Sequence, residues 1–197
     1  MDINKFLEEN DYVDFSAENI KSLSEQLFTK EMTVAEKVEK AYYYVEKETP
    51  HSSDIGEQKL TFKASDVLKY KHGICYAKSN LFAALLRGQG IPAGFCYQRL
   101  TLNDDNDDDG YAIHCLNAVW YDDHFIKLDA RGGRSAVFSL TNPVTAFPIR
   151  SQYDEYFISG IFSRQPDEII KLFSACKTRS DFFNVIPDRL KEKPDVV

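Results

Sequence analysis

The chain has 197 residues, a length that favours a single domain with a hydrophobic core of its own. Hydrophobic residues make up 43%, aromatic residues 13% and charged residues 28% of it, which excludes wholesale disorder, collagen-like repeats and coiled coils. With 31 acidic and 24 basic side chains, the formal net charge is −7, which repels nucleic-acid phosphates and anionic membrane surfaces. We therefore expect neither nucleic acid nor a membrane as a partner.

The cysteines and the N-terminal residues indicate the compartment. Cys75, Cys96, Cys115 and Cys176 are spaced too irregularly for a disulfide framework and include no Cys-x-x-Cys pair for zinc. We expect four reduced thiols. The first residues lack the apolar segment of a signal peptide, and no run of about 18 apolar residues occurs. The sequence therefore predicts a cytoplasmic protein, and nothing in it requires a cofactor.

The first half of the chain has the periodicity and the start signals of helices. Apolar residues at helical spacing predict a helix from Ser16. Thr33 and Glu36 match a capping box, in which the two side chains satisfy free amides at the start of a second helix. That helix should end at Thr49-Pro50, because a residue before proline is disfavoured in the helical conformation.

Two further helices are expected before the pattern changes. Ser65 is a suitable N-cap for a short helix, and Gly73 separates it from a helix that begins near Cys75. This second helix is rich in alanine and leucine and should be largely buried. It should end at Gly88 or Gly90, since glycine commonly closes helices.

The second half of the chain is predicted to form a sheet. Segments 93–102, 112–121 and 124–129 are rich in aromatic and β-branched residues and are separated by turn signals. Helices followed by antiparallel strands are typical of the α+β class. The secondary-structure signals weaken after Ser139. Further along the chain, Pro166 indicates the start of one more helix.

The chain shows no internal repeat, low-complexity tract or linker that would justify a second domain. We expect one domain over residues 1–197. Its core should cover about 12–140, with a helical extension at 141–197.

Cys75 is the strongest candidate for a nucleophile. In the first turn of a helix, the free backbone amides and the positive end of the helix dipole favour the thiolate over the thiol. A cysteine at such a position is nevertheless more often a packing residue, so the assignment depends on its partners.

His114 and Asp129 are the candidate partners. If Asp122 and Asp123 form a two-residue hairpin turn, then His114 and Asp129 are diagonal neighbours on one face of the sheet, with Cβ atoms about 7 Å apart. A three-residue loop would place them on opposite faces. Taken singly, they are more simply a buried strand histidine and a turn residue. In this chain order, however, a cysteine, a histidine and an aspartate supply a nucleophile, a base and a group that orients the base.

The other histidines are weaker candidates. His51 lies in a predicted loop, His72 lies on the turn before the nucleophile helix, and His124 lies at a hairpin end.

Three separate blocks of this sequence resemble the transglutaminase-like superfamily. There, a glycine and a cysteine open a helix that ends in an arginine, followed by a Gly-Ile-Pro step, as in residues 73–92 here. The stretches His114–Trp120 and Phe125–Asp129 resemble the family's histidine and aspartate strands. The resemblance covers roughly residues 12–132.

The resemblance implies a papain-like α+β fold and Cys-His-Asp acyl transfer through a thioester. Cys75 would be the nucleophile, His114 the base and Asp129 the orienting residue, acting on a peptide or protein amide. The acyl group would pass to water or to an amine. The chain is too short for the β-sandwich domains of the calcium-dependent cross-linking enzymes, so cross-linking is not the expected reaction.

The chain departs from the family pattern beside the nucleophile, which leaves the oxyanion-binding residues open. Many relatives have a tryptophan where this chain has Tyr76, and an aromatic residue where it has Leu116. The backbone amide of Cys75 is one candidate donor, and Gln98 and Tyr76 are candidate oxyanion or substrate-binding residues. A non-catalytic binding or scaffolding module with the same fold is the alternative function.

An acidic segment precedes the strand of His114. Asp105, Asp107 and Asp109 fit the start of a calcium-binding loop, but Leu116 stands where such a loop needs a bidentate glutamate. A solvated turn is the simpler interpretation. A third is that the negative loop overhangs the cleft and favours cationic substrate groups or raises the pKa of His114.

Overall fold

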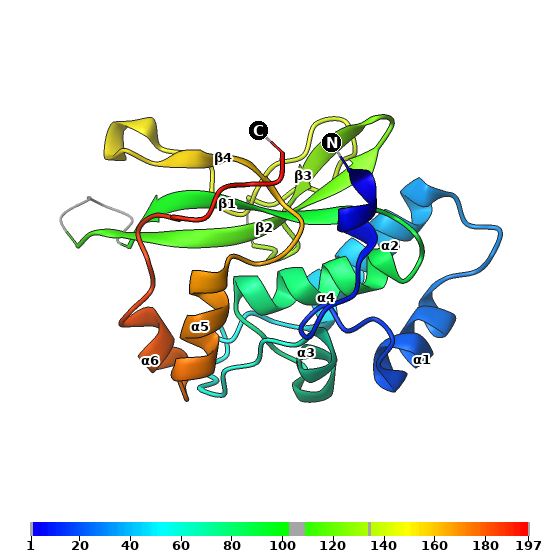
Figure 1. The fold of residues 1–197 in the computed structure, drawn as a ribbon, viewed down its shortest axis with the longest axis horizontal. Helices are drawn as coiled ribbons and strands as arrows, with labels where there is room; N and C mark the ends of the chain where they lie inside the picture. Colours follow the sequence, from blue (N-terminus) through cyan, green and yellow to red (C-terminus); the bar gives the residue numbers. More distant parts are fainter. Residues whose placement is uncertain (1, 103–108, 134, 197) are drawn as a thin grey trace.

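A four-stranded antiparallel sheet and the helices gathered on one of its sides make up the fold (Figure 1). The computed structural model describes residues 2–102, 109–133 and 135–196. The strand order is β3-β2-β1-β4. The strands are β1 (Ala93–Thr101), β2 (Tyr111–Tyr121), β3 (His124–Leu128) and β4 (Tyr156–Phe162). The predicted α+β class and the three predicted strands are confirmed.

The helices follow the predicted order. They are α1 (Glu18–Leu27), α2 (Val34–Glu48), α3 (Ala64–Tyr70), α4 (Cys75–Arg87), α5 (Asp167–Ala175) and α6 (Arg179–Phe183), with 3₁₀ helices at Ile3–Leu7 and Ser151–Tyr153. The capping box is confirmed, since the Thr33 hydroxyl accepts from the Glu36 amide and the Glu36 carboxylate accepts from the Thr33 amide. The prediction that Ser65 is the N-cap of α3 is wrong. Lys63 precedes α3, and the Ser65 hydroxyl instead donates to the Asp14 carboxylate.

Helix α4 is the centre of the hydrophobic core. All of its residues are buried, because it packs against β1 and β2 on one side and against α2 and α3 on the other. A helix buried on all sides favours apolar residues, which explains its alanine- and leucine-rich sequence. Its buried polar side chains are hydrogen-bonded: Lys78, Ser79, Asn80 and Arg87. Ile74 precedes it in an extended conformation and supplies no side-chain cap. Cys75 is therefore the first helical residue, beside uncapped backbone amides.

The β2–β3 hairpin has the predicted two-residue turn. Tyr121 pairs with His124, and Asp122 and Asp123 have φ values of 50° and 61°, which are the positive values that a type I′ turn requires. The ladder ends where Asn117 pairs with Leu128. The next residue, Asp129, therefore leaves the sheet beside the part of β2 that extends beyond β3, and this part carries His114.

Strand β4 was not predicted, and it changes the interpretation of the C-terminal part. It pairs antiparallel with β1, and Gln98 lies opposite Phe157. The segment 141–197 is therefore not only a helical extension, because it supplies an edge strand in addition to α5 and α6.

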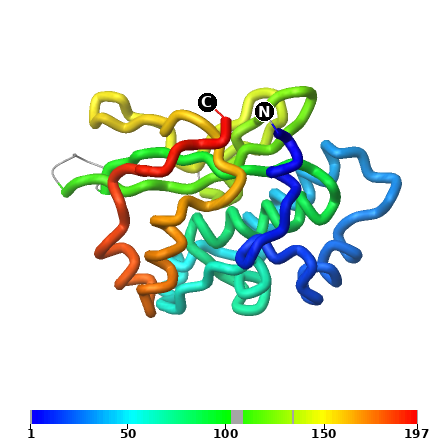
Figure 2. The backbone as a smooth tube through the Cα atoms, viewed as in Figure 1, coloured from blue at the N-terminus to red at the C-terminus, as the bar shows by residue number. Residues whose placement is uncertain are grey.

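The two ends of the chain meet on one side of the molecule (Figure 2). The final residues run back along β4, where Val196 forms a bridge with Ile161. The Lys5 ammonium lies 3.2 Å from the Asp195 carboxylate. The C-terminal stretch is therefore held by backbone pairing and by an ion pair to the N-terminal segment.

Candidate active site

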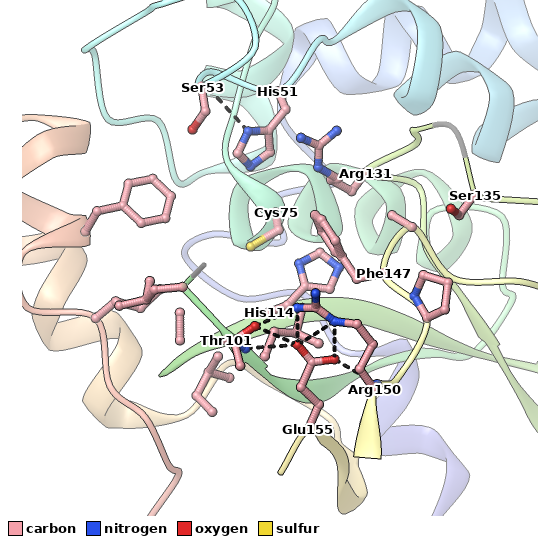
Figure 3. Close-up of a pocket in the computed structure, with 18 residues that line it drawn as sticks. His51, Ser53, Cys75, Thr101, His114, Arg131, Ser135, Phe147, Arg150 and Glu155 are labelled. Atoms are coloured by element: carbon pink, nitrogen blue, oxygen red, sulfur yellow. Dashed lines mark hydrogen bonds and ion pairs between the residues drawn. The ribbon is translucent and has the colours of Figure 1, made fainter. Parts of the chain in front are cut away.

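The structure brings the three predicted residues together at one end of the sheet. Cys75 opens α4, His114 lies on β2, and Asp129 follows β3. Nε2 of His114 lies 2.9 Å from Oδ2 of Asp129, and the Cys75 sulfur faces the His114 ring from the helix (Figure 3). Exposed fractions are 7% for Cys75, 6% for His114 and 2% for Asp129.

His114 and Asp129 form a buried ion pair. Burial alone would lower the pKa of His114, but the Asp129 carboxylate and then the Cys75 thiol outweigh it and raise that pKa to about 10. Burial alone would raise the pKa of Asp129, yet the His114 charge and the backbone amides of Ala146 and Arg131 hold it below its usual value. At neutral pH the pair is therefore imidazolium and carboxylate.

The other three cysteines lie in surroundings that favour the neutral thiol. Burial raises the pKa of Cys96 to about 12 and the pKa of Cys115 well above its ordinary value. The pKa of Cys176 is also raised, by burial and then by the charge of Asp181. None of the three lines the cavity that contains Cys75.

A cavity of about 550 Å³ opens over Cys75 and His114 (Figure 3). The Phe147 ring packs edge-on against the His114 ring, with centroids 5.0 Å apart. The remaining lining comes from the loop after α2, from β1 and β2, and from segments 131–155 and 183–186: His51, Ser53, Leu100, Thr101, Leu102, Ala112, Ile113, Arg131, Ser135, Ala146, Pro148, Arg150, Glu155, Phe183 and Ile186.

Neither predicted oxyanion side chain lies in this cavity. Gln98 is fully buried opposite His114 on β1, and its Nε2 donates to the Phe147 carbonyl at 2.9 Å. It thus holds the segment that covers the His114 ring. Tyr76 points into the core among aromatic rings, where its hydroxyl donates to the Ile113 carbonyl. The structure therefore gives both side chains packing and positioning contacts.

One wall of the cavity depends on a buried glutamate that the sequence did not indicate. The Glu155 carboxylate accepts from the Thr101 amide and lies 2.7 Å from Nη2 of Arg150. Burial alone would raise the pKa of Glu155, but these hydrogen bonds lower it to about 2. Glu155 directly precedes β4, so no predicted element drew attention to it. His51 and Arg131 were missed as pocket residues for a similar reason, because both lie in loops.

Metal and membrane features are absent from the part of the chain that the structure describes. It holds no group of three or more His, Cys, Asp or Glu side chains placed to bind a metal ion. Asp105 and Asp107 of the predicted calcium loop lie outside the described residues, and Asp109 is exposed at their edge. Of the helices described, none has the length and apolar character needed to span a bilayer.

Three solved structures are similar to this chain, and the first of them supports the fold. A structure from Cytophaga hutchinsonii named "Putative Cysteine Protease" matches with a TM-score of 0.54 and 22% identity, over 66% of this chain and 42% of that one. A Parabacteroides distasonis structure named "Putative Protease" matches 75% of this chain and 30% of its own, with a TM-score of 0.43 and 14% identity. A structure named "TGase" matches with a TM-score of 0.35 and 17% identity, over 70% of this chain and 33% of its own. This chain thus spans less than half the length of each of these three proteins.

Sequence comparison identifies the family. A search of curated proteins gave no significant match. The sequence model of the transglutaminase-like superfamily, however, matches residues 21–130, which is more than half of the chain and includes Cys75, His114 and Asp129. The chain therefore belongs to the transglutaminase-like superfamily.

Proposed function

We propose that this protein is a cysteine-dependent acyl-transfer enzyme that acts on a peptide or protein amide. The observation that carries the proposal is the placement of His114, which is buried between Cys75 and Asp129 at the floor of an open cavity. A buried histidine with a carboxylate on one ring nitrogen and a thiol at its other side has the arrangement of a nucleophile, a base and an orienting group.

The first chemical step forms a thioester. The Cys75 thiolate attacks the amide carbonyl carbon, and the carbonyl π electrons move onto oxygen. When the tetrahedral intermediate collapses, the C–N bond breaks, and the leaving amine takes a proton from the His114 imidazolium. Nδ1 is the nitrogen that exchanges this proton, because Nε2 is engaged by Asp129.

The second step regenerates the thiolate. Neutral His114 removes a proton from water or from an incoming amine, which attacks the thioester carbonyl. Collapse expels Cys75 as thiolate beside the re-formed imidazolium, and the product is a carboxylic acid or a new amide. Asp129 stays ionised throughout and stabilises the imidazolium in both resting and intermediate states.

The cavity lining indicates the kind of substrate. Its volume suits a short stretch of peptide, and apolar side chains such as Leu100, Phe147 and Phe183 line much of it. We therefore propose substrates with apolar side chains next to the scissile bond. A reducing compartment such as the cytoplasm suits this chemistry, since a catalytic thiolate is inactivated by oxidation and all four cysteines are free.

Acylation by p-nitrophenyl acetate tests this proposal. The wild-type protein should release a burst of about one p-nitrophenolate per chain and carry the acetyl group on Cys75, as located by peptide mass. The Cys75→Ala variant should show no burst. Added methylamine should then divide the acetyl group between acetate and N-methylacetamide, which measures hydrolysis against amine transfer. No burst from folded wild-type protein would contradict the proposal and favour a non-catalytic module.

A further inference from the structure

A second imidazole, that of His51, lines the cavity beside Cys75 (Figure 3). His51 follows α2 and is 7% exposed. Its backbone forms a bridge with Gly73, and the Ser52 amide donates to the Gly73 carbonyl at 3.2 Å. These contacts fix the loop to the residues that lead directly into Cys75, so the position of His51 relative to the nucleophile is fixed by the backbone.

Hydrogen bonding determines which nitrogen of His51 carries the proton. The Ser53 backbone N–H donates to Nδ1 at 3.3 Å, so Nδ1 presents a lone pair and the ring proton lies on Nε2. Among the residues that the structure describes, the His51 ring has a hydrogen bond at Nδ1 and none at Nε2. The ring therefore offers one unused N–H donor from a side chain that is more than nine-tenths buried in the wall of the cavity.

His51 stays uncharged, in contrast to His114. Burial lowers the pKa of His51 most strongly, and the nearby positive charges of Arg131, Lys78, His114 and Arg179 lower it further, to about 2. A neutral imidazole donates a hydrogen bond without giving up its proton, and its lack of charge leaves the imidazolium of His114 undisturbed. The two histidines around Cys75 thus occupy opposite protonation states at neutral pH.

We infer that Nε2–H of His51 binds the carbonyl oxygen of the scissile amide and stabilises the oxyanion that forms when Cys75 attacks. This rests on the acyl-transfer function proposed above. As the S–C bond forms, the carbonyl π pair moves onto oxygen, which accepts the hydrogen bond from His51, and no proton changes hands. His51 would supply the side-chain donor beside the backbone amide of Cys75, because Gln98 donates to Phe147 and Tyr76 is buried in the core.

Two substitutions separate this role from a purely structural one. Asparagine at position 51 keeps an acceptor near the place of Nδ1, so His51→Asn retains the bond from Ser53 but loses the donor at Nε2. Glutamine places its amide nitrogen near Nε2, so His51→Gln retains the donor but loses the acceptor. A structural role predicts that the asparagine variant works and the glutamine variant fails, whereas oxyanion stabilisation predicts the reverse.

Two electrophilic reagents that modify the same thiol, that of Cys75, provide the readout. Acylation by p-nitrophenyl acetate passes through an oxyanion, whereas alkylation by iodoacetamide displaces iodide at a CH₂ group and forms none. For His51→Asn, we expect acylation to slow by about 10²- to 10³-fold, the usual effect of removing one oxyanion donor. The rate of Cys75 alkylation in His51→Asn should stay within about threefold of wild type. His51→Gln should be acylated at least about tenfold faster than His51→Asn.

Controls keep the failures distinguishable. His124→Asn changes an exposed histidine at the hairpin and should leave both rates unchanged. Thermal unfolding identifies any variant that is not folded. The role of His51 would be overturned if His51→Asn were acylated at the wild-type rate, or if the acylation rate fell further in His51→Gln than in His51→Asn. Either result would leave the assignment of Cys75 as nucleophile intact. A wild-type protein that is neither acylated nor alkylated at Cys75 would instead overturn the proposed function.

Discussion

Asp129→Asn is expected to slow acylation of Cys75 by about 10²- to 10⁴-fold, the upper value being the loss found when the aspartate of a serine-protease triad is neutralised. Burial by itself would lower the pKa of His114, and the Asp129 carboxylate outweighs burial and raises that pKa. Without that charge, burial makes the neutral imidazole the favoured form, and the thiolate loses its cationic neighbour. An asparagine N–H facing Nε2 would also favour the tautomer with its proton on Nδ1, which cannot act as a base toward the nucleophile.

The same substitution should change the pH dependence. In the wild type, the imidazolium persists until the pH approaches about 10, so reactivity at pH 6 is supported by the ion pair. In Asp129→Asn, alkylation by iodoacetamide at pH 6 should fall steeply, because an ordinary thiol is almost wholly protonated there. At pH 9 the loss should be smaller. Stopped-flow alkylation between pH 5 and pH 10 measures both effects.

Asp129 also contributes to stability, with a sign that can be checked separately. Its pKa is lower in the folded protein than in the unfolded chain, so the ionised carboxylate stabilises the fold above its unfolded-state pKa. This contribution is lost as the pH falls through the folded value. Because the substitution removes this contribution, urea unfolding at pH 7 is needed to show that Asp129→Asn is folded in the kinetic experiments.

Asp122→Asn is the matched control for this experiment. It makes the same chemical change at the other end of β3, at an exposed turn residue, and asparagine tolerates the positive φ found there. Its acylation rate should equal that of the wild type. Equal rates for wild type and Asp129→Asn, with His114 still titrating near pH 10 by NMR, would show that Asp129 does not orient or charge the histidine.

Arg87→Met is expected to reduce the free energy of unfolding by about 3 kcal/mol, since buried carbonyls that lose a charged donor cost roughly 1–3 kcal/mol each. Arg87 is 3% exposed at the C-terminal end of α4. Its guanidinium donates to the carbonyls of Glu8, Ala93 and Ser163 at 2.6–2.9 Å. It thereby joins the N-terminal segment, the start of β1 and the residue after β4 to one helix.

The melting temperature should fall by roughly 6–12 °C for a chain of this size. Arg87→Lys should lie between wild type and Arg87→Met, because one ammonium cannot satisfy three divergent carbonyls. Arg189→Met, at an exposed arginine paired only with its neighbour Asp188 among the described contacts, should change stability by less than about 0.5 kcal/mol. A melting temperature for Arg87→Met within 2 °C of wild type would contradict the role given to Arg87.

Features set by local chemistry could be predicted from the sequence. The capping box of Thr33 and Glu36 involves residues three apart, so its hydrogen bonds follow from the sequence itself. The hairpin turn at Asp122 and Asp123 fixed the register of two strands, and with it the proximity of His114 and Asp129. The family resemblance pointed to the same three site residues, and the family is confirmed.

Features that depend on distant parts of the chain could not be predicted. β4 contains Ser159 and Gly160 and lacks a clean alternation, and its partner β1 lies about 60 residues earlier. The position of Gln98 against Phe147 follows from the folding of a loop over the sheet, which no periodicity encodes. His51 looked like a loop residue because its backbone pairing with Gly73 is a tertiary contact.

The most direct test of the Cys75–His114–Asp129 site is alkylation of the folded protein by limiting iodoacetamide near pH 6, with the adduct located by peptide mass. The label should appear on Cys75, while Cys96, Cys115 and Cys176 stay unmodified, because burial or a nearby carboxylate keeps those three thiols protonated. A Cys75 that reacts no faster than the other three, or that reacts only after unfolding, would contradict the site.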